Sequence, residues 1–223
     1  MQYFSFNHSL DPKIIGKYPQ SVNVKQMVIT GIKARDIIVL EKKAKVTDLI
    51  NVIFLEYSYK RVISGKLKDI VEKKQKLNFE EVVLFSGTTE IEDYWALSHQ
   101  HNIHMEYVDY TKSEILLRKR KPEGGTYTVK EEVSSEEEFY FKRDHYRKNK
   151  MGLLYISKIA LHAHIKDDFF LLKDVEGGTK YIVSETLKEE IEKSGCSGME
   201  FQPIELNTKE WIGSERIKIY GKA

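Results

Sequence analysis

The chain contains very little cysteine and no long apolar run. Cys196 is its only cysteine, which excludes an intramolecular disulfide and a metal site built from several cysteines. A chain of this kind suits a reducing compartment. No stretch approaches the roughly 18 consecutive apolar residues that a transmembrane helix needs. Residues 1–8 lack the basic segment and the apolar run of a signal peptide. We therefore expect a cytoplasmic protein without membrane contact.

The chain also lacks a charge excess and the common mechanism-bearing motifs. Its 223 residues carry 36 Lys+Arg and 34 Asp+Glu, a net charge of +2, whereas nucleic-acid binders usually have a clear basic excess. The patterns GxxxxGK[ST], GxGxxG, GxSxG, HExxH and CxxC are absent. With 41% apolar and 11% aromatic residues the chain is nevertheless typical of a folded protein. We predict no cofactor, no catalytic residues and no nucleic-acid partner.

Hydrophobic patterning predicts an α+β protein, mostly antiparallel sheet with two or three packed helices. Ser64 and Ser184 each precede residues at helical spacing and are expected to be N-caps. The paired glycines at 124–125 and 177–178 allow a positive φ and predict hairpin turns. Short apolar or alternating runs predict strands within 30–40, 51–57, 82–85, 94–97, 107–110, 153–161, 168–172 and 199–204, the last near a sheet edge because of Pro203.

A charged stretch divides the chain. Of the 33 residues in 118–150, 17 are charged, so this stretch can bury little apolar surface. It is expected to form a solvated hairpin and a mobile loop, or a linker. We therefore predict an N-terminal α+β half at 1–117, a charged insert or linker at 118–150, and a C-terminal α+β half at 151–223. The two halves could also form one compact domain.

The two predicted helices form a weak internal repeat. Residues 64–73 and 184–193 are identical at five of ten positions at a constant offset of 120. Two related α/β halves would explain this, but so would the similar composition of Lys- and Glu-rich helices. The surroundings differ in charge: residues 41–76 hold ten basic and five acidic residues, whereas 176–210 hold four and eight.

The C-terminal pattern is more specific. Residues 181–204, YIVSETLKEEIEKSGCSGMEFQPI, resemble the closing motif of immunity protein family 11, a Myxococcus-type family of bacterial polymorphic-toxin immunity proteins. Tyr94-Trp95, the segment 107–115 and Val62-Ile63-Ser64 resemble further blocks of that family in the expected order, so about half of the chain is covered. The resemblance implies a protein that binds and neutralises a cognate toxin domain without chemistry of its own. No functional residue carries over with it.

One acidic and aromatic segment is the best candidate for toxin contact. Glu136, Glu137 and Glu138 are followed directly by Phe139 and Tyr140. Acidic side chains can imitate phosphates in the basic cleft of a nuclease toxin, and neighbouring aromatics can supply anchors. A solvated loop or a helix start would explain the same segment.

The alternative function is a small metal-dependent or nucleic-acid-processing enzyme. Imidazoles could ligate zinc, and the basic run at 118–121 could contact phosphates, although nearby glutamates oppose the latter. Cys196 is expected just past a helix C-terminus, where the dipole raises a thiol pKa, so it is a poor nucleophile. The candidate ligands are His99, His101, His104, His162 and His164, with His145 or Asp109 completing a site.

Overall fold

A computed structural model describes residues 1–27, 35–54, 57, 60–98 and 102–222. It is an α+β fold in which thirteen strands form two mostly antiparallel sheets, as predicted. The larger sheet has the strand order β13 (Met199–Pro203), β1 (Tyr3–His8), β12 (Gly178–Ser184), β11 (Phe169–Val175), β10 (Leu153–Lys158), β8 (Glu114–Arg120) and β9 (Thr126–Lys130). The smaller sheet has the order β2 (Asn23–Met27), β3 (Arg35–Leu40), β6 (Asn78–Ser86), β7 (Thr89–Ser98), β5 (Arg61–Ser64) and β4 (Leu49–Ile50).

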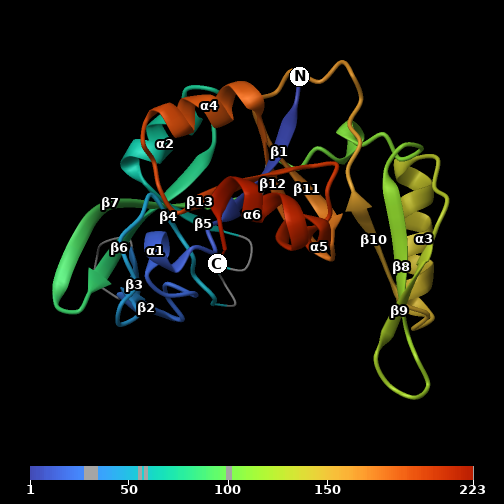
Figure 1. Cartoon of the computed structure of the whole chain (residues 1–223), viewed down its shortest axis with the longest axis horizontal. Helices are drawn as coiled ribbons and strands as arrows, with labels where there is room; N and C mark the ends of the chain where they lie inside the picture. The colour runs from blue at the N-terminus through green and yellow to red at the C-terminus, as the bar shows by residue number, and fades with distance from the viewer. Residues whose placement is uncertain (28–34, 55–56, 58–59, 99–101, 223) are drawn as a thin grey trace.

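Helices cover parts of both sheets (Figure 1). The helix α2 (Gly65–Glu72) follows the smaller sheet's β5, α4 (Glu185–Lys193) follows the larger sheet's β12, and the two lie side by side. On the other side of the molecule α3 (Glu136–Lys148) packs against β10 beside β8. The short helices are α1 (Pro12–Ile15), α5 (Thr208–Glu210) and α6 (Arg216–Tyr220), with a π-helical turn at Trp211–Glu215 joining the last two. None of the helices in the described ranges combines the length and apolarity needed to span a bilayer.

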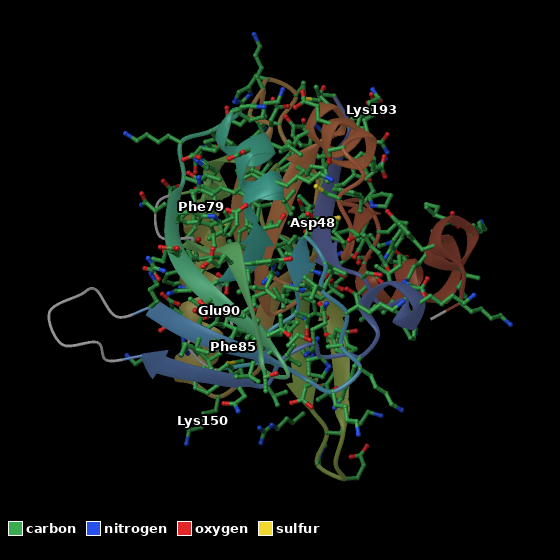
Figure 2. All side chains as sticks on the ribbon, turned by 90° about the vertical axis from the view of Figure 1, so that its left-hand side faces the viewer. Asp48, Phe79, Phe85, Glu90, Lys150 and Lys193 are labelled. Atoms are coloured by element: carbon green, nitrogen blue, oxygen red, sulfur yellow. The ribbon has the colours of Figure 1, made fainter. Side chains whose placement is uncertain are left out.

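One hydrophobic cluster joins the two sheets. Leu67 of α2 and Leu187 of α4 are both fully buried in it. Side chains from β4 and β5 pack in the same cluster as side chains from β1, β11, β12 and β13. Two further clusters lie within the smaller sheet and between the larger sheet and α3. Figure 2 labels Phe79 and Phe85 on β6 of the smaller sheet, and Asp48, which precedes β4, near the middle of the molecule. The two sheets therefore share a core.

The internal repeat is structural. The side chains of Ser64 and Ser184 both cap their helices by accepting a hydrogen bond from the backbone N–H three residues later. The φ and ψ angles are −68° and 158° at Ser64, and −70° and 160° at Ser184. The backbone N–H of each serine donates to the carbonyl of Asp48 or Asp168 at 2.9 Å, and each hydroxyl donates to the same aspartate's carboxylate. The strand pairs have equivalent registers, Leu49 opposite Ile63 and Phe169 opposite Val183. Similar composition alone does not explain a shared strand register.

The fourth strand of each repeat comes from a different place in the chain. In the smaller sheet β7 lies between β5 and β6, and it directly follows β6 in sequence. In the larger sheet the equivalent position between β12 and β13 is taken by β1, from the start of the chain. The chain's first strand is therefore an integral part of the C-terminal repeat, and β13 is an edge strand, as Pro203 predicted.

Two predicted strands are wrong. Residues 55 and 56 lie outside the described ranges; of the described residues in 51–57, only Val52 makes a bridge, an isolated one to Ser21, while Ile53 and Phe54 are exposed. The ladder stops at Ile50 because the carbonyl of Asn51 accepts hydrogen bonds from the 20–21 segment instead. In residues 107–110, Tyr107 is the last residue of a 3₁₀ turn at Met105–Tyr107, and the carbonyl of Asp109 closes the turn that follows. The predicted strand at 30–40 is confirmed for 35–40, and residues 30–34 lie outside the described ranges.

The charged stretch is more ordered than predicted. Its hairpin is confirmed as β8 and β9, but the mobile loop is wrong, because residues 136–148 form α3. Three side chains pack this helix onto the core: Phe139, which is fully buried, and Tyr140 and Tyr146, which are partly buried. The predicted boundary at residue 117 falls inside β8. The division into an N-terminal half, an insert and a C-terminal half stays a prediction.

Candidate functional site

The charged stretch folds into a unit that we call the hairpin–helix unit, comprising β8, β9 and α3. Gly124 and Gly125 both have positive φ, which allows the tight turn between the strands. The turn is closed by the Lys121 N–H, which donates to the carbonyl of Gly125 at 3.1 Å. Figure 1 shows the hairpin tip extending away from the rest of the molecule, with α3 alongside. The unit therefore places the most charged part of the sequence on one side of the protein.

The three predicted glutamates form the first turn of α3. Ser135 caps the helix by accepting from the N–H of Glu138 at 3.2 Å. The Glu138 carboxylate in turn accepts from the N–H and hydroxyl of Ser134, at 2.8 and 2.7 Å, and pairs with Lys142 at 2.8 Å. Lys142 and these hydrogen bonds lower the pKa of Glu138 to about 2. Glu138 therefore stabilises the helix start, and acidic groups there also suit the helix dipole.

Glu136 and Glu137 are freer than Glu138. Glu137 is exposed and Glu136 is partly exposed, and neither makes an ion pair within the described ranges. Burial, together with the nearby carboxylates of Glu106 and Glu137, raises the pKa of Glu136. These two side chains are thus the available acidic groups of the predicted segment.

The aromatic side chains that follow the three glutamates point to different faces of α3. Phe139 is fully buried and packs against Tyr110 with ring centroids 5.5 Å apart, so a partner cannot reach it in this conformation. Tyr140 is partly buried, with the guanidinium of Arg143 4.4 Å above its ring. The exposed aromatic is Phe141, at 74%, one turn after Glu137 on the same helix face. Sequence reasoning missed it because residues 136–148 were not predicted to be a helix.

An acidic pocket of about 530 Å³ lies between α3 and the base of the hairpin. Glu138 lines it together with residues 110–114 and 130–134, among them the carboxylates of Glu114, Glu131 and Glu132. Tyr110 also lines it, and its buried hydroxyl has no hydrogen-bond partner in the described part of the chain. Burial raises the pKa of Tyr110, so this hydroxyl is neutral at physiological pH. Lys112 and Lys130 also line the pocket, so its lining has four carboxylates against two ammonium groups.

The candidate metal ligands are only partly described. His99 and His101 lie outside the described residues. His104 pairs with Glu106 at 2.8 Å, whereas His162 and His164 stack on each other 5.7 Å apart, beyond the end of β10. Asp109 is held by Thr111 and Lys112, both at 2.7 Å, which lower its pKa to about 2. The part of the chain that the structure describes contains no group of three or more potential ligands placed to hold a metal ion.

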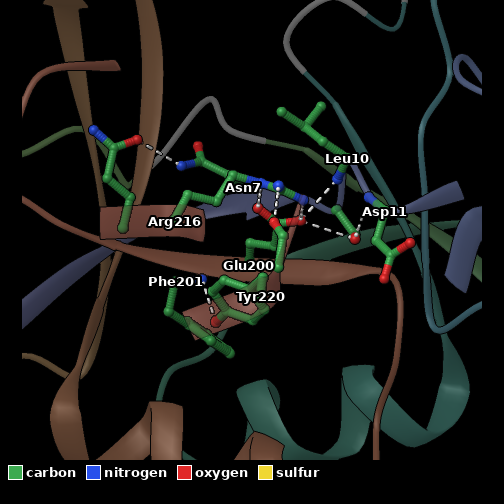
Figure 3. Close-up of polar contacts among 10 residues, drawn as sticks. Asn7, Leu10, Asp11, Glu200, Phe201, Arg216 and Tyr220 are labelled. Carbon is green, nitrogen blue, oxygen red and sulfur yellow. Dashed lines mark hydrogen bonds and ion pairs between the residues drawn. The ribbon is translucent and has the colours of Figure 1, made fainter. Parts of the chain in front are cut away.

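Sequence reasoning also missed a buried ion pair. Glu200 of β13 and Arg216 of α6 are each 1% exposed and form a double hydrogen bond, both contacts at 2.6 Å (Figure 3). The Ser9 hydroxyl and the Leu10 N–H also donate to Glu200, at 3.0 and 2.8 Å. The remaining guanidinium nitrogen donates to the carbonyl of Gly221 at 2.9 Å. These contacts fix the C-terminal helix to the edge of the larger sheet.

The thiol of Cys196 is not activated. It lies two residues beyond the Ser194 that ends α4, partly buried in the shared core, and burial raises its pKa. The hydroxyl of Ser194 donates to the sulfur at 3.0 Å. This agrees with the expectation that Cys196 is a poor nucleophile.

Comparisons with known proteins add no relative. No protein-family model matches this chain, and no curated protein matches it. The resemblance of residues 181–204 to an immunity family therefore stays a prediction.

Proposed function

We propose that this protein is an immunity protein that neutralises a cognate bacterial toxin domain by stoichiometric binding, through the outer face of α3. The observation that carries the proposal is Phe141, the most exposed large hydrophobic side chain of the described residues, next to the free carboxylate of Glu137. Exposed aromatic side chains beside complementary charges are typical of the anchors of protein–protein interfaces. The pattern of residues 181–204 supports an immunity protein in particular.

The outer face of α3 has the composition that such binding needs. Glu137, Phe141, His145 and Lys148 follow one another at helical spacing and are all exposed. The ring of Phe141 stacks on that of His145 with centroids 6.5 Å apart, which preorganises both groups. Under this proposal the face acts by binding alone and uses no cofactor, and the protein works in the cytoplasm, where a toxin would reach its target.

The test uses the toxin domain encoded next to this protein's gene. Co-expression of the two proteins should restore growth that the toxin alone prevents, and calorimetry on the purified proteins should give one toxin bound per chain. A toxin domain that neither binds nor is neutralised would contradict the proposal.

Two variants locate the binding face. Phe141→Ala removes the anchor and should weaken binding by at least about ten-fold. The double variant E136Q/E137Q removes two charges but keeps the Glu138 contacts that hold the helix, and it should weaken binding mainly by slowing association.

The matched control is E90Q/E92Q, which removes two exposed carboxylates from β7 in the other sheet. It should bind like the unmodified protein. If the control weakens binding as much as E136Q/E137Q, the effect is one of total charge, and α3 is not the contact face.

A further inference from the structure

The strand β9 leaves one edge of the larger sheet open. Among the strands that the structure describes, it is the last in the sheet order and pairs only with β8, and all five of its residues are exposed. An unpaired edge can accept a further strand, and natural proteins usually protect such edges. An added strand would meet the free backbone groups of β9 and the side chains on its two faces.

The hydrogen-bond pattern shows which backbone groups are free. The Glu131 N–H donates to the carbonyl of Ile115 at 2.9 Å, and the Lys121 N–H donates to that of Gly125. Both pairs continue the β8–β9 register, in which bonded pairs alternate with non-bonded ones. Bonded pairs recur at every second residue from Gly125 to Glu131, so the backbone groups of Tyr127 and Val129 bond to β8. The N–H and C=O groups of Thr126, Thr128 and Lys130 therefore point to the open edge.

The side chains of the hairpin are segregated by face. Thr126 lies opposite Arg120, and Thr128 lies opposite Arg118, so these four side chains and Lys130 share one face. The other face carries Tyr127 and Val129 of β9, which are 44% and 38% exposed, with Lys119 and Leu117 of β8 opposite them. An added strand would therefore meet a basic face on one side and an apolar strip on the other, in strict alternation.

The basic face is not neutralised. Arg118, Arg120 and Lys150 line a pocket of about 510 Å³ with Thr126, Gly152 and Leu153, and no carboxylate lines it. None of the three cations makes an ion pair within the described residues. The Arg118 guanidinium lies 4.9 Å above the ring of Tyr155, which orients it. The pocket therefore has a net positive charge and room for acidic side chains.

We propose that the open edge of β9 binds an extended segment of a partner protein that alternates acidic and apolar residues. The segment adds a strand to the larger sheet, its acidic residues face Arg118, Arg120 and Lys130, and its apolar residues cover Tyr127 and Val129. A second copy of this chain fits the edge poorly, because pairing β9 with itself would bring two basic faces together. The inference is independent of whether the partner is a toxin.

The test is a titration that needs no natural partner. A short blocked peptide alternating glutamate and valine is added to the isotope-labelled full chain and followed by NMR, with a lysine–valine peptide as control. The glutamate peptide should shift the amide signals of Thr126, Thr128 and Lys130 in a saturable way, and the lysine peptide should not. Equal binding of both peptides, or shifts elsewhere only, would overturn the proposal.

Two variants make the test specific. Thr128→Pro removes an edge donor but no bond to β8, and it should weaken peptide binding by roughly five- to ten-fold, whereas Thr128→Ala should not. The spectra of both variants show directly whether the fold is kept. Unchanged binding by a folded Thr128→Pro variant would overturn strand addition. Concentration-dependent broadening of the β9 amides without peptide would also overturn the proposal, because a second copy would then occupy the edge.

Discussion

At the scale of single residues, His8 makes stability depend on pH. Its Nε2 atom is buried without a hydrogen-bond partner in the described part of the chain, and burial, together with nearby Arg61, lowers its pKa well below 6.5. The folded protein therefore keeps His8 neutral at pH values where the unfolded chain binds a proton there. Stability conferred by a neutral His8 is complete above the unfolded pKa and is lost as pH falls below it.

The prediction compares the wild-type protein with His8→Gln, which has no titrating group at this position. Between about pH 7.5 and about pH 5.5 the wild-type free energy of unfolding should fall by about 1 kcal/mol more than that of the variant. Urea denaturation at the two pH values measures both. An equal fall in both proteins would show that His8 titrates normally in the folded state.

The ion pair between Glu200 and Arg216 is a second residue-scale test. Removing one partner leaves the other charge buried and unpaired, so Glu200→Gln or Arg216→Met alone should cost about 3–5 kcal/mol of unfolding free energy. The double variant should cost clearly less than the sum of the two, since no charge is then stranded. Chemical denaturation of the three variants completes the cycle, and additive losses would refute the coupling.

These residue-scale features set a limit on sequence-based reasoning. Glu200 and Arg216 could not be paired from the sequence, because their contact depends on how α6 folds back onto β13. The placement of Phe139 and Phe141 required only the knowledge that 136–148 is helical, since the helical period then separates the buried ring from the exposed one. The acidic residues of the candidate toxin-binding segment could be identified from the sequence, but its proposed anchor, Phe141, could not.

At the scale of elements, the serine N-caps can be ranked. Ser64 and Ser184 each cap a helix and also donate to a partly buried aspartate, Asp48 or Asp168, just before the preceding hairpin, whereas Ser135 only caps. Ser135→Ala should therefore cost about 1 kcal/mol, and Ser64→Ala and Ser184→Ala about 2 kcal/mol each. Denaturation curves of the three variants test this order. A loss in Ser135→Ala equal to the other two would refute a role for the aspartates.

The same elements explain which predictions succeeded. The helices after Ser64 and Ser184 were predictable because the cap and the apolar period are local signals. The described part of residues 51–57 does not form the expected strand, although its composition favours one, because the carbonyl of Asn51 accepts hydrogen bonds from residues 20–21 instead of from a neighbouring strand. The helix α3 was missed because it has few apolar side chains, and these are buried by packing against β8 and β10. A local sequence pattern does not show such tertiary packing.

At the scale of the whole molecule, the shared core should make the two sheets unfold together. Leu67 and Leu187 are fully buried at equivalent positions of the repeat, one from each half. Leu67→Ala should cost about 2–5 kcal/mol and should lower the protection of amides in β5 and β12 by the same amount. Native-state hydrogen exchange measures both strands in one experiment. A loss confined to the smaller sheet would mean that the halves are stable independently.

The surface of the whole molecule is more polarised than its net charge of +2 suggests. Within the hairpin–helix unit the start of α3 is acidic, while β8 and the residues after α3 are basic. The near-zero total charge therefore conceals local regions of opposite sign.

The most direct test of the proposed binding face is hydrogen–deuterium exchange of the protein alone and in complex with the toxin domain encoded beside it. We expect a one-to-one complex in which protection increases around Phe141 on α3 and does not change around Glu90 and Glu92 in the smaller sheet. A complex that protects the smaller sheet and leaves α3 unchanged would contradict the proposed binding face, and the absence of any complex would contradict the proposed function.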